Sequence, residues 1–331
     1  MKTQKLKLLF TLAAFIGGTA SASALDFLAP MEGPDNGINL HFTQDASYFF
    51  DADLRDGSIA DFEDNDEFSI FRAKSALNHR SELFQGTFDV EGYYEFSRYN
   101  YNDKNTSLTA NGRKFVDDTF DAGHRIGIDG AYHHHIDQIW GLYARGILEG
   151  AAMQGASLRN AGRFAAEGGM TFAPNPNFMV SLGLMWFKFL NDNNRLYPTV
   201  GFSWTIDDRF DFGMTHSLTD ITLFGHLDTW MDGRLVFDLS VAYQLRQYRV
   251  SDSAVAPAGL NGGDFGKGAM YHRSWIWTLG ATHQFNECFF IRPFVQLSTL
   301  TKLRFYLGGR ELLSTGQNIA FGLGMQGGIR W

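Results

Sequence analysis

Alternation of apolar and polar residues with a period of two is the feature that most constrains how this chain folds. In residues 84–96 the even positions are apolar or glycine, whereas the odd positions are mostly polar. In residues 235–246 the odd positions are apolar and the even positions are mostly polar. Successive side chains of a β-strand point to opposite faces, so each segment has one apolar and one mostly polar face. A helix would need apolar residues three and four positions apart, so the pattern predicts an all-β chain.

About fourteen segments show this pattern, and many are longer than the roughly five or six residues usual for strands of soluble sheets. They cover 38–50, 67–78, 84–99, 121–134, 139–153, 163–172, 178–189, 196–206, 209–217, 221–229, 234–249, 270–285, 289–304 and 318–331. A tilted strand of about 9–11 residues is long enough to cross a membrane. The segments therefore predict membrane-spanning strands.

The connections between these segments alternate between short and long. We predict short turns at 79–83, 173–177, 207–209, 231–233 and 286–288, long loops at 51–66, 100–120 and 250–269, and medium ones near 154–162 and 306–317. Such alternation is typical of transmembrane antiparallel up-and-down β-barrels, which have short periplasmic turns and longer outer loops. The connection at 218–220 is short where a long one is expected. We therefore expect about 14 strands, with 12 as the alternative.

The first 24 residues have the pattern of a secretory signal peptide. Three lysines precede an apolar stretch from Leu8 to Ile16, and Ala22-Ser23-Ala24 supplies a cleavage site. We expect residues 1–24 to be removed near Ala24, residues 25–37 to form a short periplasmic segment, and residues 38–331 to form the barrel.

Composition excludes several other classes of protein. The lone Cys288 excludes a disulfide scaffold, and outside the leader no apolar run reaches the roughly 18 residues of a membrane helix. Without the three leader lysines, 25 basic residues face 36 acidic ones, a net charge of −11. This charge argues against a nucleic-acid partner.

Charged residues at mid-strand distinguish a barrel from a soluble two-layer sandwich, the alternative fold for such strands. The polar faces carry charges that suit a wet lumen, and we predict that these residues line a pore: Asp89, Glu91, Glu95, Asp129, Arg145, Glu149, Asp238, Arg246 and Arg292. Aromatic residues near strand ends are typical of a membrane interface. We assign that position to Trp186, Trp275, Trp277 and Trp331.

The last strand carries the most specific signal. From Ile319 to Trp331 the odd positions are apolar or glycine, and the sequence ends on an aromatic residue. This resembles the carboxy-terminal assembly signal of bacterial outer-membrane β-barrels. The resemblance implies the outer membrane of a Gram-negative-type bacterium, with the barrel-assembly machinery, outer-membrane lipids and lipopolysaccharide as partners. We expect a monomer.

The central and later part of the chain also resembles an uncharacterised family of outer-membrane β-barrels, known only as a domain of unknown function. The similarity extends over roughly residues 196–305. It rests on the strand–turn–strand from Pro198 to Phe210 and on the strand from Tyr243 to Val250. It supports the fold and implies no known activity.

Two His-x-Ser pairs have the residue types of a nucleophile and its general base, as in lipid hydrolases of the outer membrane. His272 and Ser274 share a face opposite Trp275, so we expect them to point into the lumen, away from lipid. His79 and Ser81 fall in a predicted periplasmic turn. No third residue that could orient either histidine is evident, so an outer-leaflet lipid hydrolase is only the alternative function.

Other candidate motifs favour structural roles. His133, His134 and His135 alternate in direction along a strand and cannot converge on one metal ion without a turn. His216 and Asp220 belong to a triad-like set without the spacing of one, and the glycine-rich stretch 259–268 lacks the order of a phosphate loop. We expect Cys288 to be a free thiol, and neither a metal nor a cofactor to be bound.

The inward charges are mixed in sign and nearly balanced. Acids concentrate on the third segment and bases on the second and the next-to-last, which could create a field across a narrow pore. The same charges could instead pair and brace a closed lumen. We therefore favour a narrow passive channel for small polar solutes, and keep the lipid hydrolase and a structural or surface-interaction barrel as alternatives.

Overall fold

The computed structural model describes residues 39–55, 67–102, 109–110, 113–114, 121–188, 190, 194–207, 209–216, 220–228, 235–250, 268–286, 288–307 and 310–331. Nearly all of them lie in strands. The long strands are β1 (Asn39–Arg55), β2 (Glu67–Leu83), β3 (Gly86–Asn102), β6 (Ala122–His135), β7 (Trp140–Met153), β8 (Gly162–Asn175), β9 (Phe178–Lys188), β10 (Asn194–Thr205), β11 (Phe210–His216), β12 (Asp220–Asp228), β13 (Leu235–Arg249), β14 (Ala269–Gln284), β15 (Phe289–Leu307), β16 (Arg310–Gln317) and β17 (Ala320–Arg330). The two-residue strands β4 (Thr109–Ala110) and β5 (Arg113–Lys114) form a separate hairpin, and Leu158–Asn160 form a 3-10 turn, η1.

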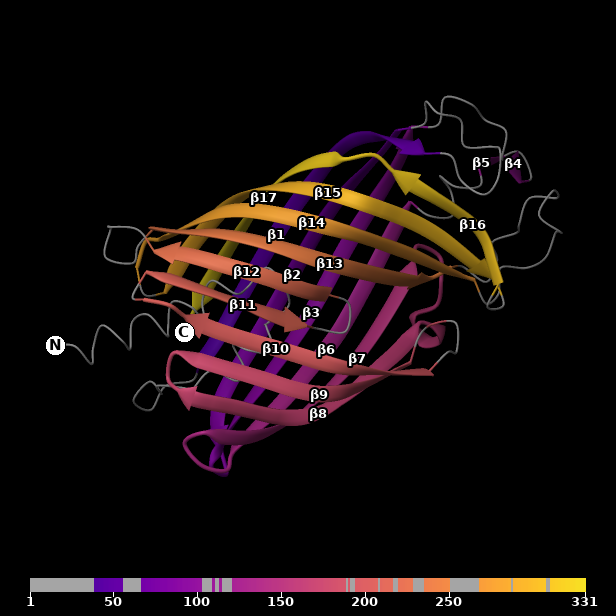
Figure 1. The fold of residues 1–331 in the computed structure, drawn as a ribbon. Coiled ribbons are helices and arrows are strands. Elements are labelled where there is room, and N and C mark those ends of the chain that lie inside the picture. Colours follow the sequence, from indigo (N-terminus) through magenta and orange to yellow (C-terminus); the bar gives the residue numbers. More distant parts are fainter. Residues whose placement is uncertain are drawn as a thin grey trace.

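The long strands follow one another around a closed antiparallel barrel (Figure 1). β1 pairs with β2 on one side and with β17 on the other, which closes the sheet. β15 pairs with β16 along its later half and with β17 along its earlier half, so β16 and β17 share one place in the wall. The barrel thus has 14 strands, as predicted. The 12-strand alternative and the two-layer sandwich are wrong.

The ends of the barrel differ, and we name them the turn end and the loop end. The turn end holds the carboxy terminus and the tight turns, whereas β16 and the β4–β5 hairpin lie toward the loop end (Figure 1). Asp137, Asp207 and Asn286 each accept hydrogen bonds from the backbone N–H groups two and three residues later, at 2.7 or 2.8 Å. These side chains begin three of the turns, as is typical of Asx turns.

Several predicted connections are shorter than expected because strand pairing continues through polar residues. Residues 79–83 are not a turn: β2 continues to Leu83, and the turn consists of Phe84 and Gln85, both with positive φ as a two-residue hairpin loop requires. His79 and Ser81 therefore lie in β2. β8 likewise extends through 173–175, and most of the predicted loop 306–317 is strand β16.

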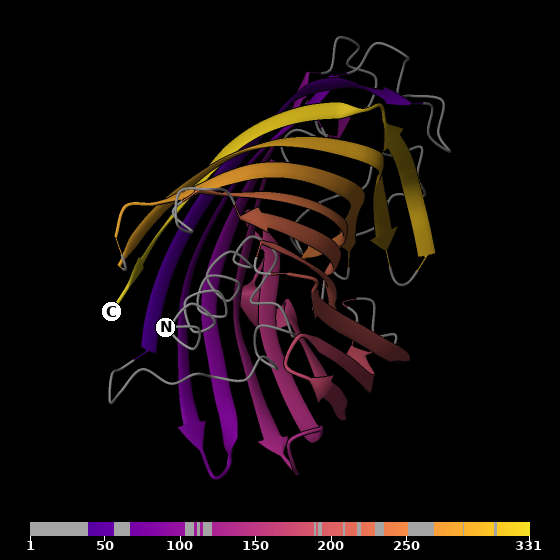
Figure 2. The ribbon, with the colours of Figure 1, turned by 60° about the vertical axis from the view of Figure 1, so that its left-hand side comes forward.

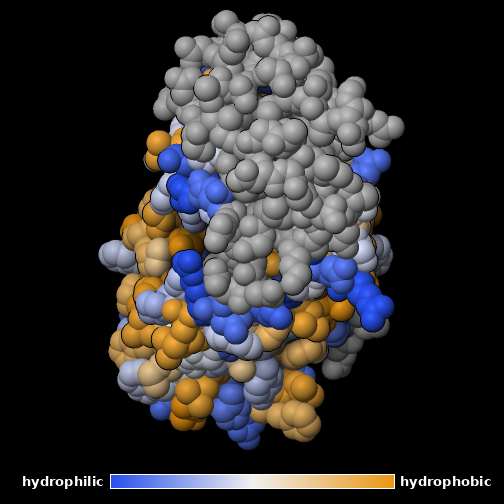
Figure 3. Space-filling model, turned by 90° about the vertical axis from the view of Figure 1, so that its right-hand side faces the viewer, coloured by the Kyte–Doolittle hydropathy of each residue, from blue (hydrophilic) through white to orange (hydrophobic). Residues whose placement is uncertain are grey.

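Apolar side chains cover the outer surface, as the alternation predicts. Along β7, outward residues are exposed and inward ones buried from Trp140 to Glu149. The exposed apolar set includes Leu148, Leu182, Leu184, Val200, Leu223, Leu239, Leu279, Val295 and Leu323. Seen from the loop end, such side chains lie over the flanks of the barrel (Figure 3). No helix of the described residues is long and apolar enough to span a bilayer. The fold and its surface are those of a transmembrane β-barrel.

The barrel narrows toward the loop end because β11 and β12 are short (Figures 1 and 2). β12 accompanies β13 only as far as Gln244, and β8 accompanies β7 only as far as Gly150. Beyond these points β13 pairs directly with β7, in parallel, at Arg249 and Ala152. The outer part of the wall is therefore a smaller ring formed by β13, β14, β15, β16, β1, β2, β3, β6 and β7.

Apolar side chains fill this smaller ring, and we call them the outer core. Its members are Phe49, Leu54, Phe68, Ile70, Tyr99, Tyr101, Ala151, Met153, Tyr248, Val250, Met270, Ile276, Leu303, Phe305 and Ala320, all buried. Phe68 stacks on Tyr99, and Tyr99 meets Tyr248 edge-to-face across the ring. These buried side chains make the interior largely apolar at this level.

Candidate functional site: the charged layer of the barrel interior

All nine charged residues predicted to line a pore point into the barrel. Eight are buried, and Asp129 keeps 16% of its side chain exposed. Burying an unpaired charge is strongly unfavourable, so the contribution of these residues to stability depends on the groups they pair with. The partners fall into pairs along the wall and pairs across the lumen.

Some pairs join charges that lie near one another along the wall. Lys74 on β2 contacts Glu91 on β3 at 3.0 Å. Arg80 and Asp89 form a similar pair at 2.9 Å on the same two strands. Lys74 and Arg80 on β2 therefore neutralise Glu91 and Asp89 on β3 directly. The expected field between opposed acidic and basic walls is not present between these strands, because they are neighbours.

Arg292 reaches across a whole strand to form its ion pair. It contacts Asp238 on β13, although β14 lies between β13 and β15. Gly280 occupies the intervening position on β14, and a Cβ there would lie 2.6 Å from Arg292 Nε. Only glycine leaves room for the guanidinium to cross at this point.

A denser cluster surrounds Glu149 on β7. Arg125 on β6 donates to Glu149 at 2.7 Å and to Glu95 on β3 at 3.1 Å. Arg163 on β8 and the Tyr93 hydroxyl also donate to Glu149. One fully buried carboxylate thus joins donors from three other strands.

Arg246 connects opposite walls of the barrel. Its Nε lies 2.9 Å from Glu95 on β3, and its Nη1 donates to Asp220 on β12 at 3.1 Å. Next to it, the Tyr248 hydroxyl donates to Ser97 on β3 at 3.1 Å. β3 and β13 lie far apart around the sheet, so these contacts cross the lumen.

Arg72 forms a second crossing contact. Its Nη1 donates to Gln244 on β13 at 3.1 Å, and its Nη2 lies 3.2 Å from His272 Nδ1 on β14. Because arginine only donates, His272 Nδ1 is the acceptor. His272 and Ser274 point inward and are buried, as predicted. His272 is thus part of the interior network and lies away from lipid.

His216, the last residue of β11, contacts residues on β7 and β8. His216 Nε2 lies 2.6 Å from Glu167 on β8, and its carbonyl oxygen accepts a hydrogen bond from Arg145 on β7 at 2.9 Å. Arg145 also pairs with Asp129 on β6. His216 and Asp220, which the sequence placed in a triad-like set, therefore belong to separate networks.

We use the term charged layer for ten inward residues at mid-height: Asp45, Arg72, Lys74, Glu91, Glu95, Arg125, Glu149, Arg163, Asp220 and Arg246. Five are acidic and five are basic, and Asp45 lies opposite Lys74 in the strand register. Their contacts join both walls and leave the layer without net formal charge. The layer can therefore close the lumen by ion pairs and hydrogen bonds.

The predicted interface tryptophans are exposed: Trp186, Trp275, Trp277 and Trp331 keep 38–60% of their surface. Trp186 lies near the loop end of β9, and Trp331 at the turn end follows β17. Trp277 lies close to the middle of β14. Their place at the membrane interface stays a prediction.

The remaining motifs show no catalytic or metal-binding arrangement within the described residues. His133 points inward and contacts Thr171 at 2.8 Å, whereas His134 stacks on Tyr132. No group of three or more His, Cys, Asp or Glu side chains in the described ranges could hold a metal. Cys288 is exposed and forms no disulfide. Almost all of the glycine-rich stretch 259–268 lies outside the described residues, as do residues 1–38.

The outer core is the interior feature that the sequence analysis missed. Its signal was present, because apolar residues also occupy inward positions near the loop ends of the strands. Tyr99 and Tyr101 follow Glu95 on the inward face of β3, and Tyr248 follows Arg246 on β13. Apolar residues at inward positions near the loop ends of these strands indicate that side chains fill the interior there.

Comparison with family models and with curated proteins finds no match for this chain. No family model matches it, so the resemblance of residues 196–305 to an uncharacterised barrel family gains no support from that comparison. No curated protein matches either.

Comparison with solved structures finds outer-membrane channels of low sequence identity. The deltaS2 mutant of TodX, a monoaromatic hydrocarbon channel, has a TM-score of 0.48 and 10% identity, with 95% of each chain covered. A Pseudomonas aeruginosa FadL homologue has a TM-score of 0.47 and 11% identity, over 89% of this chain and 90% of that one. An outer-membrane channel from Pseudomonas putida F1 scores 0.45 at 10% identity, over 91% and 99%.

Proposed function

We propose that this protein is an outer-membrane channel for small polar solutes, closed in the present structure by the charged layer. One observation carries the proposal: Arg246 joins Glu95 on one wall to Asp220 near the other by ion pairs. The predicted signal peptide and the apolar outer surface support the outer membrane as its location. The lumen-facing charges, from Asp89 to Arg292, would line the path once it opens.

The chemistry of the closure supports a path that can open. Buried ion pairs are poor sources of stability, because well-packed apolar residues of similar volume are often as stabilising or more so. A barrel that only needed bracing at mid-height would gain as much from an apolar interior. Ion pairs can exchange partners with water and polar solutes, which suits a narrow passage.

A permanently closed structural barrel is the second candidate. The outer core favours it, because aromatic and aliphatic side chains fill the narrow ring at the loop end. A conducting state requires these side chains to move together with the charged layer. A structural barrel would keep them in place.

Conductance in planar bilayers separates the two candidates. Arg246→Gln removes the cation that bridges the walls but keeps a polar side chain. A hydrogen bond to a charged group contributes about 1.5–3 kcal/mol, so the open fraction should rise about tenfold or more. Lys74→Gln is the matched control, because its partner Glu91 lies on the neighbouring strand.

The channel proposal predicts rare openings for the wild type, more for Arg246→Gln, and little change for Lys74→Gln. Absence of conductance in all three proteins, with insertion verified by protease protection in liposomes, would overturn it in favour of the structural barrel. Equal gains in the two variants would show that Arg246 is not the closure.

A further inference from the structure

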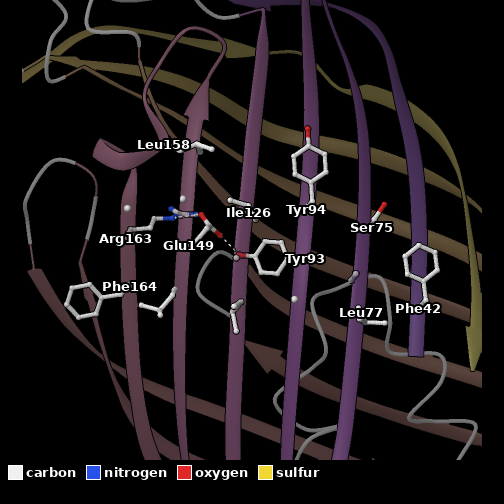
Figure 4. Close-up of a pocket in the computed structure, with 17 residues that line it drawn as sticks. Phe42, Ser75, Leu77, Tyr93, Tyr94, Ile126, Glu149, Leu158, Arg163 and Phe164 are labelled. Carbon is white, nitrogen blue, oxygen red and sulfur yellow. Dashed lines mark hydrogen bonds and ion pairs between the residues drawn. The ribbon is translucent and has the colours of Figure 1, made fainter. Parts of the chain in front are cut away.

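The outer surface of the barrel carries an apolar groove of about 810 Å³. It crosses the outward faces of β1, β2, β3, β6, β7 and β8 (Figure 4). Its outward lining includes Leu77, Tyr94, Ile126, Leu148 and Phe164. Tyr93, Glu149 and Arg163 lie behind it, on the inward side of the same wall. Since Glu149 and Arg163 also belong to the charged layer, the groove and that layer share this part of the wall, and the groove opens on the outer surface.

Glycines at outward positions create this groove. Gly92, Gly150 and Gly162 lie between larger outward side chains, which leaves a hollow in the wall. A Cβ added at Gly92 or Gly162 would meet no atom within 4 Å, so both positions open onto free space. Leu148 and Ile126 stand 66% and 53% exposed beside them. The hollow is long and apolar, which fits a hydrocarbon chain.

Polar and basic groups lie at the loop end of the groove and beyond it. The Tyr94 hydroxyl contacts His124 Nδ1 at 2.8 Å. Arg98 points outward four residues further along β3, about 13 Å from Tyr94 at a rise of roughly 3.3 Å per residue. Arg159 is exposed in η1 and directly follows Leu158, which lines the groove. Asp121 lies 3.5 Å from Arg98 and is the acidic neighbour of this group.

We propose that the groove binds an acyl chain of a phosphorylated membrane lipid, with the phosphate near Arg98 and Arg159. In a bilayer the solvent is itself apolar, so specific binding depends on packing and polar contacts. The groove supplies the packing for one chain. The guanidinium groups of Arg98 and Arg159 suit phosphate, and Asp121 is the acid paired with Arg98.

Filling the groove tests the acyl-chain part. Gly92→Leu with Gly162→Leu puts side chains into the hollow at two positions where an added Cβ meets no atom within 4 Å. Gly146→Leu is the matched control, because Gly146 is also outward-facing on β7 with no atom within 4 Å of its Cβ, but does not line the groove. Native mass spectrometry of the purified full-length mature protein would measure bound dipalmitoyl phosphatidylglycerol. We expect the filled variant to bind it at least about threefold more weakly than the control, since it loses packing contacts.

The headgroup part is tested by Arg98→Gln with Arg159→Gln. This variant should lose the preference for dipalmitoyl phosphatidylglycerol over dipalmitoylglycerol, while it still binds one lipid. An unchanged preference would overturn the assignment of the phosphate. Equal lipid binding by the wild type, the filled variant and Gly146→Leu would overturn the groove as a site.

Discussion

The interior of this barrel changes character along its axis, from ion pairs at mid-height to apolar packing at the loop end. The same strands supply both regions. On β3 the inward positions change from Glu95 to Ser97 and then Tyr99, and on β13 from Arg246 to Tyr248. Each change takes place within a few residues. Neighbouring inward positions of one strand are therefore stabilised differently, by ion pairs at one position and by apolar packing at the next.

The difference lies in what each region requires of its partners. A buried charge needs a specific group of opposite sign at short distance, and it becomes costly when that group is lost. An apolar side chain needs only neighbours that fill the space around it. The charged layer should therefore be intolerant of single changes, whereas the outer core should accept volume-conserving ones.

The largest expected effect is at Glu149. Glu149→Ala leaves Arg125 and Arg163 buried without this carboxylate, so the free energy of unfolding should fall by about 3–5 kcal/mol. Urea unfolding in lipid vesicles, followed by tryptophan fluorescence, measures it. Glu311→Ala is the control, because its ion pair with Arg304 lies outside the charged layer with both side chains 31–36% exposed, and a loss below about 1 kcal/mol is expected. Similar losses for both variants would contradict the special status of the charged layer.

In the outer core, Leu303→Ala should lower the free energy of unfolding by about 3 kcal/mol, because it leaves a cavity in a fully packed region. Leu303→Met should lower it by less than about 1.5 kcal/mol. The same urea titration distinguishes them. A loss for Leu303→Met as large as that for Leu303→Ala would show that the outer core also needs specific partners.

Tyr248→Phe tests the boundary between the two regions. It removes the hydroxyl that donates to Ser97 and keeps the ring against Tyr99. The expected loss is about 1 kcal/mol, the typical net value of one hydrogen bond. A loss near that of Glu149→Ala would place Tyr248 in the charged layer and not at its edge.

The fold was predictable from local pattern, because each strand shows its orientation in its own residues. Each of the fourteen segments corresponds to a long strand, whereas β16 lies in the predicted loop 306–317. The charges from Asp89 to Arg292 all point inward. Turns were less predictable, because polar residues such as His79 and Ser81 still pair as a strand. The side chains of these residues do not indicate where hydrogen bonding between the two strands ends.

The contacts across the lumen were not predictable from the same pattern. Glu95 and Arg246 meet because the barrel narrows, and it narrows because β11 and β12 are short enough for β13 to reach β7. That shape depends on the relative lengths of distant strands. The sequence therefore predicts which residues face inward without predicting which of them meet.

The smallest effect on stability is expected for Asp137 at the turn end, which lies outside the charged layer and the outer core. Its substitution gives a reference value against which the losses in those two regions are compared. Backbone N–H groups of Ile139 and Trp140 donate to its carboxylate and hold its pKa below the usual 3.8. A lowered pKa means that this contribution to stability is fully present above the unfolded pKa and is lost as pH falls through the folded one. Asn286 makes the same turn without a titrating group.

The wild type should therefore lose a little stability as pH falls below about 4, and Asp137→Asn should remove this dependence on pH. Near pH 7 the urea midpoint of unfolding should be almost the same for both proteins. Urea titrations of both proteins across this range measure the difference. The acid is fully exposed, so the difference should be far smaller than the losses at Glu149 or Leu303. If it were comparable, unfolding would be governed by the turns. The contrast between the charged layer and the outer core would then have little bearing on stability.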